Sequence, residues 1–263
     1  MTSLAVKKYI TNQTQFRFSF LLCSNKVNDY LYSSINSCLL QTFKDYELII
    51  VLNGEAANFF EQLKKKYLDK KIKILKTDIK YLTNALNVGL EVCSGEYIVR
   101  IDADDINFID RLERVNSLLE ESDNMTKMVF SDFEYIDSRD NKFSRHKKAS
   151  NIKSIYYKNP IPHPTVVINR EFLLELGGYQ GFIYSEDYEL WVRLVLNQGM
   201  SAITQIHSPT IYYRSDVTGL ARGSKMSYAG QASCQIYAFM MTFDIRWLIG
   251  FFFTFFKGIF CGK

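Results

Sequence analysis

Short apolar blocks alternate with segments of helical periodicity through roughly the first two thirds of the chain. In one such segment Leu31, Ile35, Cys38 and Leu39 recur at the spacing of a helix face, while the blocks around it favour buried strands. This order is typical of an α/β fold with a mostly parallel central sheet flanked by helices. The expected strands are 18–22, 47–52, 73–75, 97–101, 128–131 and 165–168, and the expected helices are 29–40, 56–67, 82–92 and 111–120.

The composition excludes several classes of protein. With 263 residues, 47% of them hydrophobic, the chain can bury the core of one large domain or two small ones. A net charge of +4 is too small for nucleic acid to be the main partner. The five cysteines are scattered without a C-x-x-C pair, and the N-terminus has no apolar run typical of a secretory signal, so we expect a cytoplasmic protein.

The segment RIDADDI, residues 100–106, places three carboxylates directly after an apolar block. In open α/β sheets ligands bind at the carboxyl ends of strands, and on an extended backbone Asp102 and Asp104 point to the same side. Two carboxylates so close repel unless a cation joins them, and Mg²⁺ or Mn²⁺ suits such ligands. The alternative is a solvated loop before a helix that has Asp110 at its N-cap.

A set of short motifs then resembles family-2 glycosyltransferases of the GT-A fold, from about residue 18 to residue 214. The motifs share the order and spacing of that family, although each is weak alone. They are FSFLL (18–22), SCLLQTFKDYEL (37–48), GEYI (95–98), DADD (102–105), DRL (110–112), HPT (163–165), GGY (177–179) and SEDYELW (185–191).

The resemblance implies a nucleotide-sugar donor, a divalent metal (Mn²⁺ or Mg²⁺) and an inverting transfer of the sugar to an acceptor hydroxyl. Asp104 matches the metal-ligating residue of the family motif, and Asp102 is expected to face the ribose or the metal. Asp187 matches the catalytic base; the alternative for Asp187 is an acidic first helical turn favoured by the helix dipole. We expect a glycosyltransferase domain at 1–223, with a nucleotide-sugar half at about 16–125 and an acceptor half at about 126–223.

Three further residues are expected at the donor. Asn53 stands where the family often has an aspartate that contacts the base, which keeps a uracil contact possible and favours a UDP-sugar. Cys23 begins a segment that departs from the family pattern, and Asn84 belongs to a helix beside the donor pocket. The alternatives are a simple Asn53-Gly54 turn and a helix that carries the amide of Asn84 to solvent.

Two residues from the second half complete the expected site. His163 lies in the proline-rich turn, where it would touch the diphosphate or the acceptor, or else pack the loop. Arg214 resembles the arginine that follows the last strand in bacterial members, where it would meet phosphate, or else is an ordinary surface residue. Trp191 is expected either to stack on an acceptor sugar or to lie in the core.

Residues 224–263 form the expected C-terminal helical tail. Its uncharged run 247–256 is ten residues long, about half of the roughly 20 needed to span a bilayer. We expect this run to lie on the cytoplasmic face of the inner membrane, with Trp247 at the headgroups. The alternative is packing on the domain or on a second subunit. If the tail only docks on lipid, deleting 240–263 should free the protein and preserve nucleotide binding.

Together these features predict a transferase that extends a glycan or lipid-linked acceptor in bacterial surface polysaccharide synthesis. One rival is a sugar nucleotidyltransferase, which usually has a Gly-rich loop after its first strand; residues 22–25 contain no glycine. The other is a catalytically silent sugar-nucleotide-binding scaffold on the same fold.

Overall fold

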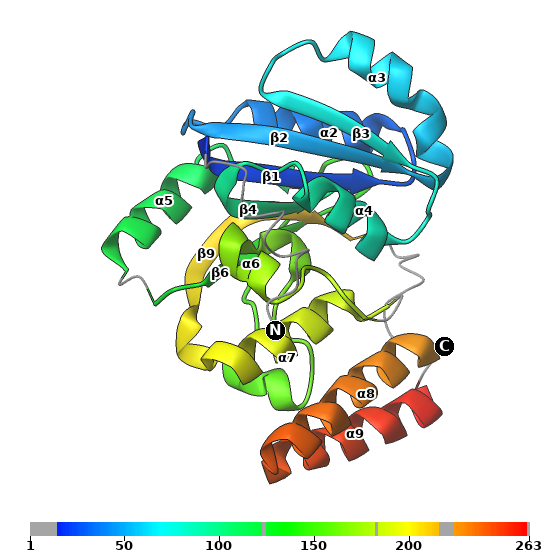
Figure 1. Cartoon of the computed structure of the whole chain (residues 1–263), viewed down its shortest axis with the longest axis vertical. Coiled ribbons are helices and arrows are strands. Elements are labelled where there is room, and N and C mark those ends of the chain that lie inside the picture. The colour runs from blue at the N-terminus through cyan, green and yellow to red at the C-terminus, as the bar shows by residue number, and fades with distance from the viewer. Residues whose placement is uncertain (1–14, 123–124, 182–183, 216–223, 262–263) are drawn as a thin grey trace.

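The computed structural model describes residues 15–122, 125–181, 184–215 and 224–261. Within these ranges one curled sheet runs through the molecule, with helices on both faces (Figure 1). Its strand order is β3-β2-β1-β4-β8-β6-β9-β5, with β7 beside β6. The strands are β1 (Phe16–Ser24), β2 (Tyr46–Asn53), β3 (Ile72–Thr77), β4 (Gly95–Asp102), β5 (Ile106–Asn107), β6 (Met128–Ile136), β7 (Lys142–Lys147), β8 (Val167–Asn169) and β9 (Ile203–Arg214).

The first four strands in this order form the predicted parallel half of the sheet. The apolar runs of β1 and β2 are buried on both faces, as expected where helices cover each side, whereas the edge strand β3 is only partly buried. Side chains alternate between two cores: Leu21 and Cys23 belong to one, and Phe20 and Leu22 to the other. The helices on these faces are α2 (Asp29–Leu39), α3 (Phe60–Lys66), α4 (Leu82–Leu90), α5 (Arg111–Glu121), α6 (Arg170–Glu175) and α7 (Glu186–Gln198).

The second half of the sheet is mixed, so the expectation of mostly parallel strands holds only for the first half. Strand β8 runs antiparallel to both β4 and β6, whereas β9 runs parallel to β6 and antiparallel to β5. The predicted strand 165–168 starts later, because Thr165 closes a 3₁₀ turn, His163–Thr165, set by the prolines around it. The predicted helix 56–67 is likewise divided, into a 3₁₀ segment Gly54–Phe59 followed by α3.

A fully buried carboxylate ties the parallel strands together. Glu47 of β2 accepts hydrogen bonds from the hydroxyl of Ser19 and from the backbone and hydroxyl of Ser94, and it pairs with Lys73 at 2.8 Å. Burial alone would raise the pKa of Glu47, but the bonds from Lys73, Ser19 and Ser94 hold it below its ordinary value. This network holds β1, β2 and β3 in register beside the start of β4. The register in turn sets which residues lie together where these strands end.

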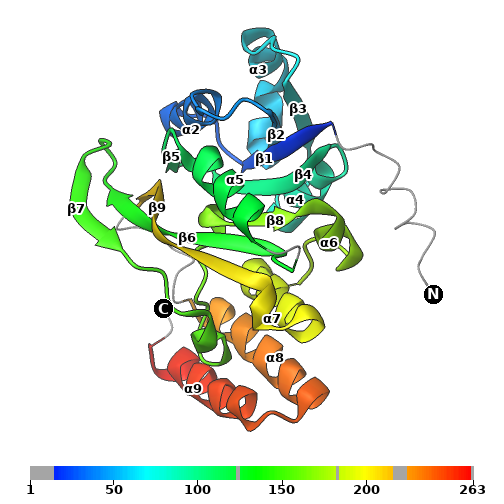
Figure 2. The ribbon, with the colours of Figure 1, turned by 90° about the vertical axis from the view of Figure 1, so that its left-hand side faces the viewer.

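The C-terminal residues form a hairpin of two helices, α8 (Lys225–Thr242) and α9 (Ile245–Cys261), at the opposite end of the molecule from the parallel strands (Figure 2). Phe243 joins the helices in the left-handed conformation, with φ of 55°. No helix in the described residues combines the length and apolar character needed to cross a membrane.

The hairpin corrects part of the prediction for the tail. Trp247 is 2% exposed and stacks edge-on against Tyr156 at 4.6 Å, so it lies in the protein core and not at the level of lipid headgroups. A side chain on Gly250 would lie 1.8 Å from the carbonyl oxygen of Tyr156, so the two backbones touch there. One face of α9 thus packs on the domain, and deleting 240–263 would uncover part of the core.

Candidate active site

The strands β1, β2 and β4 end together and bring several predicted residues to one cleft. Cys23 lies beside Asp102 in the sheet, and Asn53 ends the next strand. Burial raises the pKa of the Cys23 thiol to about 12, so Cys23 offers the cleft a neutral thiol. The cleft measures about 460 Å³ and is lined by Cys23, Ser24, Asn25, Lys26, Asn28, Tyr30, Asn53, Lys80, Leu82, Arg100, Asp102, Ala103 and Asp104.

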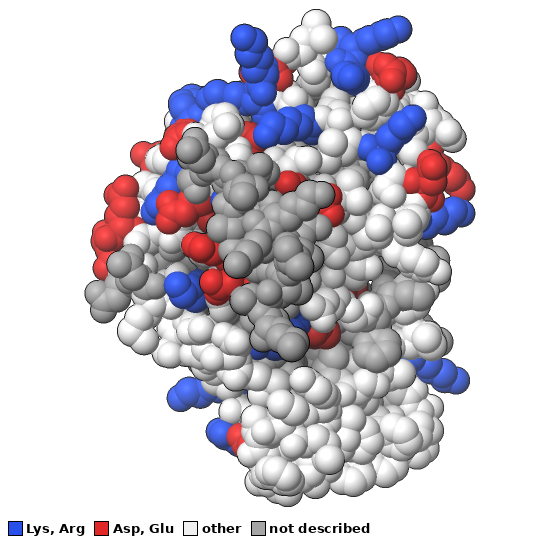
Figure 3. Space-filling view, in the orientation of Figure 1, with Lys and Arg blue, Asp and Glu red and all other residues white. Residues whose placement is uncertain are grey.

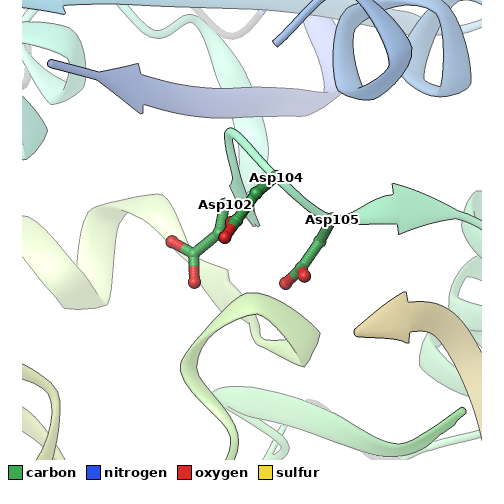
Figure 4. Close-up of side chains that lie close together, drawn as sticks. All are labelled: Asp102, Asp104 and Asp105. Atoms are coloured by element: carbon green, nitrogen blue, oxygen red, sulfur yellow. The ribbon is translucent and has the colours of Figure 1, made fainter. Parts of the chain in front are cut away.

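The acidic motif folds into a tight turn at the end of β4, where the backbone of Asp105 donates to the carbonyl of Asp102 at 3.2 Å. One ligand atom from each of Asp102, Asp104 and Asp105 lies within 4.8 Å of the other two. Figure 4 shows the carboxylates of Asp102 and Asp104 close together, with Asp105 on the other side of the turn. The predicted pair is therefore assembled, and Asp105 is a third member that the sequence did not single out as a ligand.

The proximity of these carboxylates makes the turn hard to ionise fully. Desolvation and the charge of Asp102 raise the pKa of Asp104 to about 6. Burial also raises the pKa of Asp105, and both neighbouring aspartates add to that effect. A cation bound among them would remove this repulsion.

Arg214 supports the acidic turn through hydrogen bonds. Its backbone donates to Asp105 at 2.8 Å and its Nε donates to the carbonyl of Asp104 at 2.8 Å, while its terminal nitrogens bond Asp137 and Asp140. The guanidinium also stacks on the ring of Tyr30 at 4.2 Å. Arg214 is thus a buried support of the motif, and the predicted contact with phosphate stays a prediction.

A second arginine lies at the floor of the cleft and was not predicted. Arg100 of β4 is 1% exposed; it pairs with Asp102 and donates to the carbonyls of Leu21 and Ile101. Its charge also acts on Asp104, Asp105 and Glu186, so it partly compensates both acidic groups of the site. A lone arginine inside an apolar strand gives no sign in the sequence of which carboxylates it will meet.

The second acidic group opens α7, which begins after Ser185 as predicted. Ser185 does not cap the helix with its side chain; its hydroxyl instead donates to the carbonyls of Tyr184 at 2.7 Å and Ser227 at 3.1 Å. Asp187 accepts hydrogen bonds from the amide of Asn159 at 2.6 Å and from the backbone of Tyr188 at 2.7 Å.

The two acidic groups influence each other's ionisation. Burial raises the pKa of Asp187, against these two hydrogen bonds, and it raises the pKa of Glu186 to about 7. The charge of Asp102 contributes to both increases. The charges of the acidic turn of β4 and of the start of α7 therefore interact, although Glu186 and Asp187 are not among the residues that line the cleft.

The other predicted residues have structural partners. Asn84 accepts a hydrogen bond from Thr77 at 3.0 Å and is not among the residues that line the cleft. His163 is buried beside Tyr179 and Trp191, and burial together with Arg100 lowers its pKa far below the ordinary value, so the imidazole is neutral. Trp191 is fully buried, so of its two predicted roles it has the one in the core and does not stack on an acceptor sugar.

Comparison with known proteins gives a consistent result. The family model described as Glycosyl transferase family 2 matches residues 20–177. The O-antigen biosynthesis glycosyltransferase WbnJ of Escherichia coli is 32% identical over 184 residues, which cover 67% of this chain and 71% of WbnJ. The UDP-Glc:alpha-D-GlcNAc-diphosphoundecaprenol beta-1,3-glucosyltransferase WfgD of Escherichia coli is 29% identical, covering 70% of this chain and 72% of WfgD. The match to the uncharacterized glycosyltransferase MJ1057 of Methanocaldococcus jannaschii is 31% identical and covers 66% of this chain but 62% of that protein.

Two solved structures show the same fold at low sequence identity. The structure of S. aureus TarS in complex with UDP-GlcNAc has a TM-score of 0.67 and 16% identity, and the match covers 87% of this chain and 67% of that one. The mannosyltransferase PcManGT of Pyrobaculum calidifontis, in complex with GDP-Man and Mn²⁺, has a TM-score of 0.62 and 14% identity, covering 97% of this chain and 79% of that one. The GT-A fold that the sequence motifs predicted is confirmed.

Proposed function

The chain belongs to glycosyltransferase family 2, and on that premise we propose that it transfers a sugar from a UDP-sugar to a hydroxyl of a lipid-linked glycan, with inversion at the sugar. The observation that supports the proposal is a pair of acidic groups whose charges interact, one lining the cleft at the strand ends and one at the start of α7. The turn with Asp102 and Asp104 lies at the strand ends, and Asp187 lies close enough for its ionisation to respond to Asp102. Sugar transfer needs these two functions: stabilisation of a leaving diphosphate and removal of a proton from the acceptor.

Asn53 supports a uracil base in the donor. Its amide nitrogen donates to the carbonyl of Lys80 at 2.6 Å, which leaves its amide oxygen as the free group. That oxygen is buried without a hydrogen-bond partner in a residue that lines the cleft, and such an atom is costly unless a ligand donates to it. The N3–H of uracil is a suitable donor. The name of WfgD contains UDP-Glc and TarS was solved with UDP-GlcNAc, whereas PcManGT was solved with GDP-Man.

The acidic turn suits a divalent cation. The ligand atoms of its three carboxylates lie close enough to share one ion, and one carboxylate oxygen of Asp105 is buried without a hydrogen-bond partner. We propose that Asp102 and Asp104 hold Mn²⁺ or Mg²⁺, with Asp105 supporting the turn. When bound, the ion would supply positive charge to the diphosphate as negative charge develops there. Arg100 and Arg214 hold the acidic turn in place with or without a bound ion.

Asp187 is the proposed general base. Asn159 orients its carboxylate, and the raised pKa of Asp187 makes it a better proton acceptor than an exposed aspartate. The acceptor hydroxyl would approach from the side of α7, opposite the departing diphosphate, which gives inversion. His163 is neutral and buried, so its proposed part is to shape the site near Arg100.

The proposed acceptor and location come from the relatives. WbnJ is named for O-antigen biosynthesis, and the name of WfgD gives an acceptor sugar on diphosphoundecaprenol. We propose that this chain likewise extends a lipid-linked glycan in bacterial surface polysaccharide synthesis, at the cytoplasmic face of the inner membrane. In this scheme residues of about 16–125 bind the donor, about 126–223 bind the acceptor, and the tail, 224–263, contacts the membrane.

A nucleotide-binding experiment tests the donor site. The melting temperature is measured with UDP, GDP, CDP and dTDP, each with and without Mn²⁺, on the wild type, Asp104→Asn and Asp45→Asn. Asp45 is an exposed aspartate at the other end of the same strands and serves as the matched control. We expect UDP to stabilise the wild type and Asp45→Asn in a Mn²⁺-dependent manner and to lose that effect in Asp104→Asn. Equal stabilisation of Asp104→Asn would refute the metal assignment, and no stabilisation by any nucleotide would refute the donor site.

A further inference from the structure

The outer face of α9 is an aromatic stripe that no described part of the chain covers. We use this name for Ile245, Ile249, Phe252, Phe253, Phe256 and Phe260, which recur at helical spacing on one side. All six are exposed, with Phe253 at 68% and Phe260 at 80%. Phe252, Phe256 and Phe260 stack in sequence along the helix, so the stripe is continuous. Contiguous apolar surface of this kind marks an interaction site.

The opposite face of α9 is part of the protein interior. Trp247 and Thr254 are buried, and Gly250 contacts the backbone of Tyr156. The helix therefore cannot swing away to hide its phenylalanines against the domain. Whatever covers the outer face comes from outside the described chain.

The hairpin itself carries a net positive charge. Between Lys225 and Cys261 the sequence has one acidic residue, Asp244, and its carboxylate is bonded to Arg246. Lys225 and Lys257 add positive charge without an acidic neighbour in the same segment. Figure 3 shows the surface over α8 and α9 as a broad area free of charged side chains, with both basic and acidic side chains near its margins. An apolar face with a basic rim complements an anionic lipid surface.

From these observations we propose that the outer face of α9 docks on an anionic lipid bilayer, with the helix axis in the membrane plane and the phenylalanines below the headgroups. No helix in the described residues, α9 included, is both long and apolar enough to cross a bilayer, whereas lying along it buries the entire stripe. The docked partner is the membrane itself; a second copy of this chain on the same face is the competing outcome.

The docking would also orient the active site. Helix α7 lies beside α8 in both ribbon views (Figures 1 and 2), and the hydroxyl of Ser185, directly before α7, donates to the carbonyl of Ser227 in α8. The hydroxyl of Tyr188 donates to Ile155, in the 3₁₀ turn Ile152–Tyr156 on which α9 packs. A seated hairpin therefore holds Asp187 at a fixed position relative to the lipid surface. This step rests on the proposed function, in which the acceptor is lipid-linked.

Vesicle flotation of the full chain tests the docking. The vesicles are phosphatidylcholine alone and phosphatidylcholine with phosphatidylglycerol. The test variant is Phe253→Gln/Phe256→Gln/Phe260→Gln, and the control variant is Leu68→Gln/Ile109→Gln/Met125→Gln, which removes three exposed apolar side chains elsewhere. We expect the wild type and the control to float with anionic vesicles and less with neutral ones, and the test variant to lose about tenfold or more in partitioning. Circular dichroism and the melting temperature verify that each variant is folded, and UDP–Mn²⁺ binding is measured separately.

The possible results separate the proposals. Flotation of the test variant at the wild-type level would overturn the docking proposal. Failure of the wild type to bind either kind of vesicle would overturn it as well. A lipid-free wild type that is dimeric, becomes monomeric in the test variant and binds no vesicle would assign the face to a second copy. Vesicle binding by a protein that binds no nucleotide would support the docking and refute the proposed function instead.

Discussion

Replacing Asn159 by alanine should change the pH dependence of catalysis without removing the base. The amide of Asn159 donates to Asp187 at 2.6 Å, and this bond stabilises the ionised carboxylate. Because a base must be ionised to accept a proton, activity falls as the pH drops through the pKa of Asp187. Loss of the bond raises that pKa further, so the acid limb of the profile moves to higher pH.

The size of the effect follows from the geometry. A hydrogen bond to a charged group contributes about 1.5–3 kcal/mol, and one pKa unit corresponds to about 1.36 kcal/mol, which bounds the displacement at about 1–2 pH units. Asp187 is half-buried and keeps its bond from the backbone of Tyr188, so the lower end applies. We expect the acid limb to rise by about one pH unit.

The assay is release of the nucleoside diphosphate from the donor, with kcat/KM measured across pH. Asn116→Ala is the matched control, because Asn116 lies on α5 and bonds Arg17 and Glu120, away from the cleft. Its profile should superimpose on that of the wild type. If the Asn159→Ala profile also superimposes on the wild type, Asp187 is not the group that titrates, and the assignment of the base fails.

Three further predictions concern the metal, the hairpin and the core. Since the pKa of Asp104 is raised to about 6, Mn²⁺ must compete with a proton below that pH; calorimetric titration should show affinity falling between pH 7.5 and 5.5, whereas a pH-independent affinity would contradict the site. Gly250→Ala should lower stability by about 1–3 kcal/mol or more, because the added carbon overlaps the carbonyl of Tyr156, while Phe253→Ala on the exposed side should leave the melting temperature unchanged. Glu47→Ala should cost about 1–3 kcal/mol near neutral pH, since it leaves the buried hydroxyls of Ser19 and Ser94 without their acceptor, while Lys73 is partly exposed and can be solvated. The pKa of Glu47 is lowered in the folded state, so its contribution to the free energy of unfolding is present above the pKa of the unfolded chain and is lost as the pH falls through the folded pKa. Denaturant unfolding of the wild type and Glu47→Ala at pH 7 and at pH 3 measures this difference. An equal loss of stability at both pH values would contradict the prediction.

The parallel half of the fold was predictable because its signals are local. Strands β1 and β2 are compact apolar runs, as in β2, where all eight residues are buried, and α2 repeats apolar residues at helical spacing. Strand β9 gave no such signal: its residues alternate irregularly between buried and partly exposed, and its pairing with β6 shifts register next to Pro209. Its place between β6 and β5 depends on contacts that are distant in sequence.

The residues of the candidate site likewise divide into those with a local sequence signal and those without one. Asp102 and Asp104 were predictable from one strand and its turn, and the start of α7 from the change to a helical pattern. Arg100, Asp105 and Asn159 were not, since each acquires its role from a partner on another element or across the turn. Trp247 was misplaced because an aromatic run on an amphipathic helix does not reveal which of its faces meets the protein.

The turnover of Asp187→Asn, measured beside its affinity for UDP and Mn²⁺, tests the central claim most directly. This change keeps the shape of the side chain and removes its ability to accept a proton. We predict unchanged nucleotide affinity and a loss of at least about 100-fold in kcat, the usual contribution of a general base. A variant that binds nucleotide and turns over within about twofold of the wild type would contradict the claim that sugar transfer depends on the two acidic groups acting together.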